Sequence, residues 1–146
     1  MTNRKLIGCI MLVITLFLSG CSINRATADR DPSFDPAKIK SLYVVKQPRD
    51  GRNINVLIAN SLSRMGYKTD TGIAPTPEFD IIATYEDRWQ WDMTVYMLEL
   101  TIVIRDKNSN FPLATGHSMH TSLTRLTPQE MVDEVLSNIF KGTVSK

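Results

Sequence analysis

The most regular pattern in the chain is an alternation of apolar and polar residues between Tyr96 and Arg105. Every residue of one parity is large and apolar: Tyr96, Leu98, Leu100, Ile102 and Ile104. Successive side chains of a β-strand point to opposite faces of a sheet, so a period of two predicts a strand with one face against a core. The polar run 106–110 then predicts a hairpin loop.

Shorter segments of strand-like composition lie on both sides of this run. We expect strands at 42–45, 67–71, 80–89 and 113–122. Turn and loop residues separate them, with Pro48-Arg49-Asp50-Gly51 after the first strand and two prolines within 73–79 before the third.

Two segments carry apolar residues at helical spacing instead. In the first, about 53–65, the stripe is Ile54, Leu57, Ile58, Leu62 and Met65, and Gly66 stands where a left-handed C-terminal cap belongs. The second begins with Thr127-Pro128-Gln129-Glu130, which has the residues of a capping box and a proline at the first helical position. Its stripe is Val132, Val135, Leu136, Ile139 and Phe140.

The predicted element order is therefore β-α-β-β-β-β-α. This order favours the α+β class, with a largely antiparallel sheet of four to five strands and both helices on one face. The pattern does not fix the order of the strands within the sheet.

The first twenty residues have the pattern of a secretory signal peptide. Arg4 and Lys5 precede an apolar run of thirteen residues, Leu6–Leu18. A membrane-spanning helix needs about 20 apolar residues, so the run is short for that role. It closes with Leu18-Ser19-Gly20-Cys21, which closely resembles the lipobox of bacterial lipoproteins.

The lipobox resemblance implies that the signal peptidase recognises Leu18, Ser19 and Gly20, that it cuts before Cys21, and that Cys21 carries acyl chains. Two or three chains hold a protein on a membrane, whereas a single chain binds only marginally. Ser22 in place of aspartate resembles lipoproteins sorted to the outer membrane rather than retained at the inner membrane. An ordinary cleaved signal and an uncleaved N-terminal anchor are the alternatives.

Three segments follow from this interpretation. They are a lipoprotein signal peptide over 1–20, the lipidated Cys21 with a flexible tether over 21–36, and a single α+β periplasmic domain over 37–146. The tether segment is polar, contains two prolines and has no period. We expect the protein to be lipid-anchored at the outer membrane and to face the periplasm.

Cleavage also changes the charge and the cysteine content. The full sequence has 17 Lys and Arg against 15 Asp and Glu, and removing Arg4 and Lys5 leaves 15 of each sign. A balanced surface does not favour nucleic acid as a partner. Cys9 is lost with the signal, so an intramolecular disulfide is excluded in the mature chain. We expect no cofactor.

Several short motifs occur in an order that resembles one protein family. They are Asp31-Pro32-Ser33-Phe34, Arg64-Met65-Gly66-Tyr67, Phe79–Tyr85, Leu100–Asp106, Thr115-Gly116 and Val132–Phe140. They resemble an uncharacterised family of Gram-negative lipoproteins that share a domain of unknown function. The resemblance spans almost the whole mature domain, but the family brings no established activity with it.

Trp89-Gln90-Trp91-Asp92 is the most unusual stretch of the mature chain, and it is the candidate partner surface. Both tryptophans lie near a strand-to-strand connection and share a parity. Three interpretations stay open. The two rings cover an edge of the core, form a contact surface for a partner protein, or lie at a membrane interface, where an apolar ring with a polar N–H is suited.

The segment Gly116-His117-Ser118-Met119-His120 contains catalytic residue types without a catalytic pattern. A nucleophile elbow needs a second glycine where His120 stands. His117 and His120 are three residues apart, which places them on opposite faces of a strand, so we expect no metal site. Glu86 and Asp87 are expected to be ordinary surface charges.

These observations predict a non-enzymatic accessory or interaction module in cell-envelope assembly or maintenance. Its contacts would be the membrane, through the acyl chains, and an envelope protein. The alternative is a small-ligand or glycan-binding lipoprotein that uses Trp89 and Trp91 as a stacking platform. A hydrolase is the third hypothesis, and the lack of a nucleophile–base arrangement disfavours it.

Overall fold

The computed structural model describes residues 24–79 and 81–142, so Cys21 and the signal segment lie outside the described residues. The described elements are β1 (Asn24–Arg30), η1 (Pro36–Lys38), β2 (Ser41–Val45), α2 (Ile54–Arg64), β3 (Lys68–Gly72), β4 (Ile81–Asp92), β5 (Thr94–Asp106), β6 (Pro112–His120), η2 (Ser122–Thr124) and α3 (Pro128–Lys141). The α+β class is confirmed, with both predicted helices and every predicted strand present.

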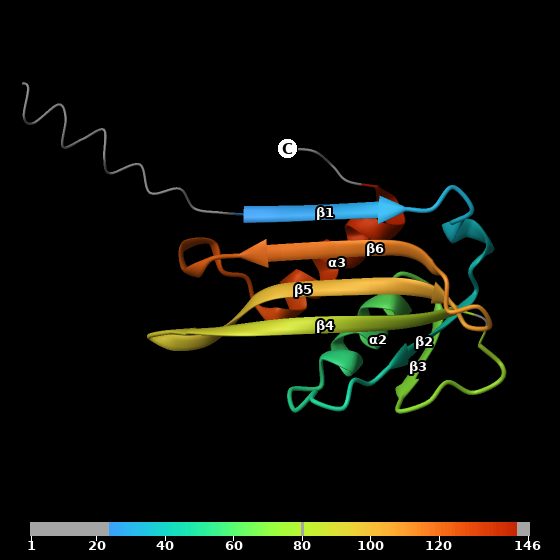
Figure 1. The fold of residues 1–146 in the computed structure, drawn as a ribbon, viewed down its shortest axis with the longest axis horizontal. Coiled ribbons are helices and arrows are strands. Elements are labelled where there is room, and N and C mark those ends of the chain that lie inside the picture. Colours follow the sequence, from blue (N-terminus) through green and yellow to red (C-terminus); the bar gives the residue numbers. More distant parts are fainter. Residues whose placement is uncertain (1–23, 80, 143–146) are drawn as a thin grey trace, which may run out of the picture.

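The described strands form one six-stranded sheet in the order β1-β6-β5-β4-β2-β3 (Figure 1). Strand β2 runs parallel to both β3 and β4, whereas β4, β5, β6 and β1 pair antiparallel. The expected sheet of four to five largely antiparallel strands was therefore wrong in number and in part of its pairing. Helix α2 carries the chain back across the sheet, which is what makes β2 and β3 parallel neighbours.

The sixth strand comes from the segment that the sequence analysis assigned to a flexible tether. All seven residues of β1 pair with β6. The Arg30 guanidinium also donates to the backbone carbonyl of Asn138, at 2.7 Å. Beyond β1, Phe34 packs edge-on against Phe140, with 5.7 Å between the ring centroids. The ordered domain therefore begins no later than Asn24 rather than at residue 37.

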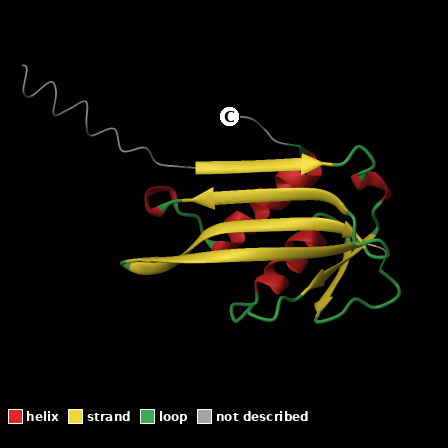
Figure 2. Cartoon of the chain, in the orientation of Figure 1, coloured by secondary structure: helices red, strands yellow, loops and turns green. Residues whose placement is uncertain are grey.

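Both helices cover the same face of the sheet, as Figure 2 shows, and the core lies between the two layers. On β5, Leu100, Ile102 and Ile104 are fully buried, as the alternation predicted. The predicted helical stripes supply the facing residues, among which Ile58, Leu62, Val132, Val135, Leu136 and Ile139 are fully buried.

The alternation fails at one point on β5. The register shifts opposite Arg88 and Trp89, so that Arg88 pairs with Glu99 and Trp89 pairs with Met97. Leu98 is the extra residue of this β-bulge, and the parity reverses beyond it. Met97 is consequently fully buried in the core, whereas the sequence pattern had assigned that face to Leu98.

The predicted helix ends are confirmed. Gly66 has a φ of 99°, and the backbone N–H groups of Gly66 and Tyr67 donate to the carbonyls of Ser63 and Leu62. That pair of bonds is the Schellman motif, in which glycine avoids the strain of a left-handed residue. At the start of α3, Thr127 and Glu130 form both hydrogen bonds of the capping box.

The opposite face of the sheet carries mostly polar side chains. Phe79, at the end of the loop before β4, is an exception and packs against Tyr43 of β2 at 5.4 Å. Near the middle of this face, the Glu99 carboxylate forms an ion pair with the Arg88 guanidinium and lies 2.6 Å from the Nε2 atom of His117. Among the described residues, no helix combines the length and the apolar character needed to cross a bilayer.

Replacement of Gly116 should test the contact between α3 and the sheet. A Cβ atom at this position would lie 2.7 Å from side-chain atoms of both Val135 and Ile139. We expect Gly116→Ala to lower the free energy of unfolding by about 1–3 kcal/mol, because overpacking forces the helix away from the sheet. Urea unfolding measures this change. The matched control is Gly51→Ala, where the added atom meets nothing within 4 Å, and equal effects at both positions would contradict the assigned packing.

Candidate functional site at the β4–β5 hairpin

Strands β4 and β5 extend beyond the rest of the sheet as a two-stranded hairpin (Figure 1). The pairing continues to Trp91↔Val95 and Asp92↔Thr94 at its end. Met93 makes the turn with a φ of 58°, in the left-handed region that side chains with a Cβ atom seldom adopt. The Met93 side chain is exposed at this turn.

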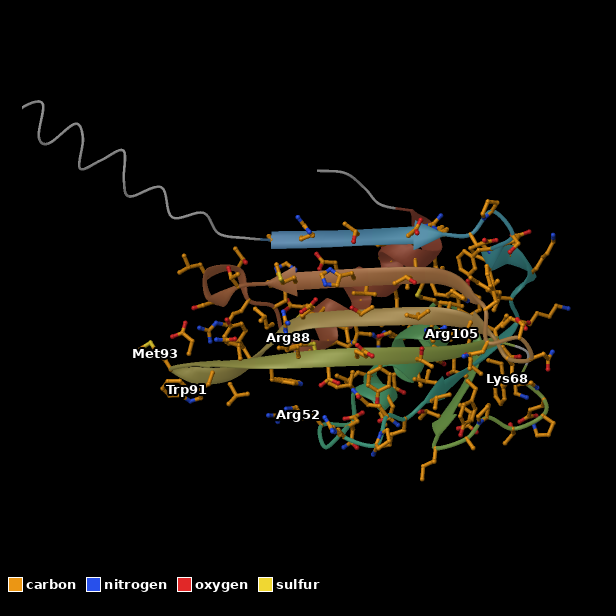
Figure 3. The ribbon with its side chains drawn as sticks, in the orientation of Figure 1. Arg52, Lys68, Arg88, Trp91, Met93 and Arg105 are labelled. Carbon is orange, nitrogen blue, oxygen red and sulfur yellow. The ribbon has the colours of Figure 1, made fainter. Side chains whose placement is uncertain are left out.

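Large apolar side chains gather at this end of the molecule. The exposed fractions are 72% for Trp91, 88% for Met93 and 51% for Val95. Leu123 of the adjacent η2 turn is 82% exposed. We call these four residues the apolar tip. Figure 3 shows Trp91 and Met93 at the extreme end of the hairpin, pointing away from the body of the domain.

Polar contacts connect the hairpin to the segment that carries Leu123. The Arg125 guanidinium donates to the Thr94 hydroxyl at 2.8 Å and lies 4.6 Å from the centre of the Tyr96 ring. The Asp92 carboxylate accepts from the Ser122 hydroxyl and lies 4.0 Å from the same guanidinium. These contacts hold η2 beside the hairpin and leave the Asp92 charge paired.

Trp89 differs from Trp91 although both have the parity that the sequence indicated. The Trp89 ring packs against the edge of the core, and its indole N–H donates to the Asp87 carboxylate. The Arg52 guanidinium covers one face of the ring, 4.2 Å from its centre. Trp89 therefore covers an edge of the core, as one of the three interpretations expected. Most of the Trp91 side chain is left uncovered by the described residues.

A buried carboxylate holds the loop that carries Arg52. Asp50 is 7% exposed and accepts hydrogen bonds from the Tyr85 hydroxyl at 2.6 Å and from the backbone N–H groups of Arg52 and Asn55. Burial would raise the pKa of Asp50, but these hydrogen bonds together lower that pKa below its ordinary value. Burial, and then the bond to Asp50, raise the pKa of Tyr85.

The two histidines lie on opposite faces of β6, as their spacing predicted. The Nε2 atom of His117 lies 2.6 Å from Glu99 on the polar face. On the helix-covered face, the Nε2 atom of His120 lies 2.9 Å from the Glu134 carboxylate, which also accepts the Ser118 hydroxyl at 2.5 Å. In a Ser-His-acid triad the serine hydroxyl donates to the histidine, whereas Ser118 donates to Glu134, so this trio lacks the triad arrangement.

Of the acidic pair at 86–87, Glu86 is exposed and Asp87 takes part in local contacts. Asp87 accepts from Trp89 and from the Gln47 side chain, and the neighbouring Arg88 pairs with Glu99. Within residues 24–79 and 81–142, no three His, Cys, Asp or Glu side chains come together as a candidate metal site.

A separate groove lies away from the hairpin. It has a volume of about 280 Å³, and its lining includes Phe34, Lys38, Lys40 and Leu113. Neither tryptophan contributes to it, so the aromatic side chains singled out in the sequence and this concave surface belong to different parts of the domain.

Sequence comparison adds no family assignment, because no protein-family model and no curated protein matches the chain. The resemblance to an uncharacterised lipoprotein family therefore rests on the motifs alone. Comparison with solved structures does find the fold. Two structures of the PelC dodecamer from Paraburkholderia phytofirmans match with TM-scores of 0.57 and 0.55 at 13% and 15% identity, covering 79% of this chain and 98% and 95% of theirs.

A PDZ domain protein from Parabacteroides distasonis also matches, with a TM-score of 0.51 and 10% identity over 90% of this chain and 39% of its own. TolB and a minor lipoprotein, both from Acinetobacter baumannii, are among the further matches. Their TM-scores of 0.49 and 0.36 are too low to establish a common fold with this chain. The PelC and PDZ domain matches show a shared fold at 10–15% identity, which does not identify the function of this chain.

Replacement of Asp50 should reveal how far its hydrogen bonds stabilise the loop beside Trp89. Because the pKa of Asp50 is lowered in the folded state, its contribution is present above the ordinary pKa of about 4 and is lost as the pH falls through the lowered value. We expect Asp50→Asn to lower the free energy of unfolding by about 1–3 kcal/mol at pH 7, with a smaller deficit near pH 3.

Urea unfolding at the two pH values measures this difference. Asp70→Asn is the control, since Asp70 lies exposed on β3. A deficit for the Asp50 variant that does not shrink at low pH would show that the carboxylate charge is not what stabilises the loop.

Proposed function

We propose that this protein is a lipoprotein of the outer membrane, acylated at Cys21 and facing the periplasm. It serves as a non-enzymatic accessory or interaction module in cell-envelope assembly or maintenance. The observation that carries the proposal is the apolar tip, a cluster of exposed apolar side chains at the end of the sheet where the N-terminal segment enters the domain. An anchor and a contact surface at the same end of the domain would suit a protein that acts at the surface of the envelope.

The pairing of β1 supports this arrangement. Asn24, the first residue of β1, pairs with His120, the last residue of β6, and η2 with Leu123 follows directly. The lipobox-like segment is therefore connected to the domain at the end that carries the apolar tip. We propose Trp91 and its neighbours in the tip as the partner surface, because Arg52 and the core edge already contact Trp89.

Two other features favour an interaction module over the alternatives. Arg52 covers one face of Trp89, which does not favour a platform of two tryptophans for stacking a sugar. The Ser118 hydroxyl is bound to Glu134 rather than to His120, which does not favour a hydrolase. A non-enzymatic role agrees with both contacts.

Replacement of the lipobox cysteine tests the anchor. We expect Cys21→Ser to lose incorporation of a labelled fatty acid and to move from the membrane fraction to the soluble fraction of the cell. The variant has no thiol at this position to which acyl chains can be attached. Trp91→Ala is the control and should remain acylated and in the membrane fraction. Normal maturation and unchanged membrane association of Cys21→Ser would contradict the proposal.

Photo-crosslinking in intact cells tests the tip as a contact surface. A photo-reactive phenylalanine analogue in place of Trp91 should form crosslinks to envelope protein or lipid that depend on Cys21, because the anchor would hold the tip against the envelope. The same analogue in place of Phe111, which is exposed in the β5–β6 loop, is the control. Gel shift and mass spectrometry measure the adduct yields. Equal yields from the two positions would contradict the assignment of the tip as a contact surface.

A further inference from the structure

The reach of the hairpin and the length of the chain before β1 set limits on where the apolar tip lies. Cys21 precedes Asn24 by three residues. A fully extended chain spans at most about 3.3–3.6 Å per residue, so the Cα atoms of Cys21 and Asn24 are separated by roughly 10 Å at most. An acylated Cys21 would therefore hold the start of β1 close to the membrane surface.

The hairpin extends farther than this connection. Asn24 is level with His120, and Met119 pairs with Glu99, which places Leu98 at about the same level on β5. Met93 is five residues beyond Leu98, which corresponds to roughly 16 Å at 3.3 Å per strand residue. Along the strand direction, Met93 at the end of the tip therefore lies past the farthest point that Cys21 can occupy.

The chemistry of the tip matches the surface that it would meet. Trp91 and Met93 offer an indole and a flexible thioether at the extreme end (Figure 3), and Val95 and Leu123 add aliphatic surface. Tryptophan is enriched at membrane–water interfaces because its ring is apolar and its N–H is polar. Asp92, the acidic residue between Trp91 and Met93, accepts a hydrogen bond from Ser122 and lies close to Arg125. Insertion of the tip would therefore not bury an unpaired charge at this position.

We propose that the apolar tip inserts into the interfacial layer of the bilayer that carries the acyl chains of Cys21. This inference rests on the lipid anchor of the proposed function and identifies the contact as lipid. The anchor and the tip then form two attachment points, separated across the sheet by two to three strand spacings, about 10–14 Å. Two points fix the tilt of the domain, with its strands directed toward the membrane.

A thiol placed in the tip tests the insertion. In the mature, acylated protein Cys21 has no free thiol, so a Met93→Cys variant carries one reactive cysteine. Reconstituted in phosphatidylethanolamine–phosphatidylglycerol vesicles without other proteins, this variant should lose most of its reactivity toward a membrane-impermeant maleimide. Phe111→Cys is the matched control: Phe111 is also exposed and apolar, it lies in the loop between β5 and β6 at the other end of these strands, and its variant should stay fully reactive.

Intrinsic fluorescence gives an independent measurement in the same vesicles. Lipids with brominated acyl chains should quench the wild-type protein, and Trp91→Phe should remove that quenching because it leaves Trp89, which is packed against the core edge, as the one tryptophan. Trp91→Phe keeps an aromatic ring at the tip, so the comparison does not depend on loss of binding.

Each other outcome overturns the inference and identifies what replaces it. Acylated, vesicle-bound Met93→Cys that reacts as fast as Phe111→Cys would show that the tip stays in water while the anchor stands. Protection that requires added envelope proteins would assign the tip to a protein partner. Protection in detergent that grows with protein concentration would assign it to a second copy of the chain. A mature protein without acyl chains would refute the proposed function, and the inference with it.

Discussion

The packing of two helices against one face of the sheet is the interaction on which the rest of the structure depends. Fully buried residues of α2, α3 and β5 meet in a single layer, and Gly116 lets the Val135 and Ile139 side chains of α3 approach β6 closely. This layer can cover only part of the sheet. A helix of 14 residues such as α3 is about 21 Å long, whereas the 13 residues of β5 extend about 43 Å. The β4–β5 hairpin is the part left uncovered, so its apolar side chains stay exposed.

The features of the fold that depend on local sequence could be predicted, and those that depend on pairing at a distance could not. The buried face of Leu100, Ile102 and Ile104, the two helical stripes and their caps all follow from the periods of strand and helix. Strand β1 was missed because Ala26 and Ala28 are small and their neighbours polar, so its pattern resembles that of a linker. The parallel pairing of β2 and the bulge at Leu98 are set by partner strands, which no local pattern encodes.

For the same reason, the sequence identified only part of the candidate site. The sequence singled out Trp91 by its residue type and separated His117 from His120 by parity, which is a local property. It could not distinguish Trp91 from Trp89, because that difference depends on Arg52 and the core edge approaching from elsewhere in the chain. Met93, Val95 and Leu123 were missed because each is ordinary by itself. Recognising 92–94 as the turn of a long hairpin would have placed Val95 opposite Trp91.

Exposed apolar side chains at the end of a hairpin are a liability for a domain that diffuses freely, because such patches favour association and aggregation. On the proposed function, the anchor changes this balance. Acyl chains on Cys21 confine the domain to one surface, and the short connection to β1 presents the tip to that surface before it can meet another tip in solution. The contacts of Asp92 with Ser122 and Arg125 act in the same direction, since they neutralise the charge that would oppose insertion. The helices are too short to cover the β4–β5 hairpin, and on the proposed function the anchor turns this exposed hairpin into a second membrane contact.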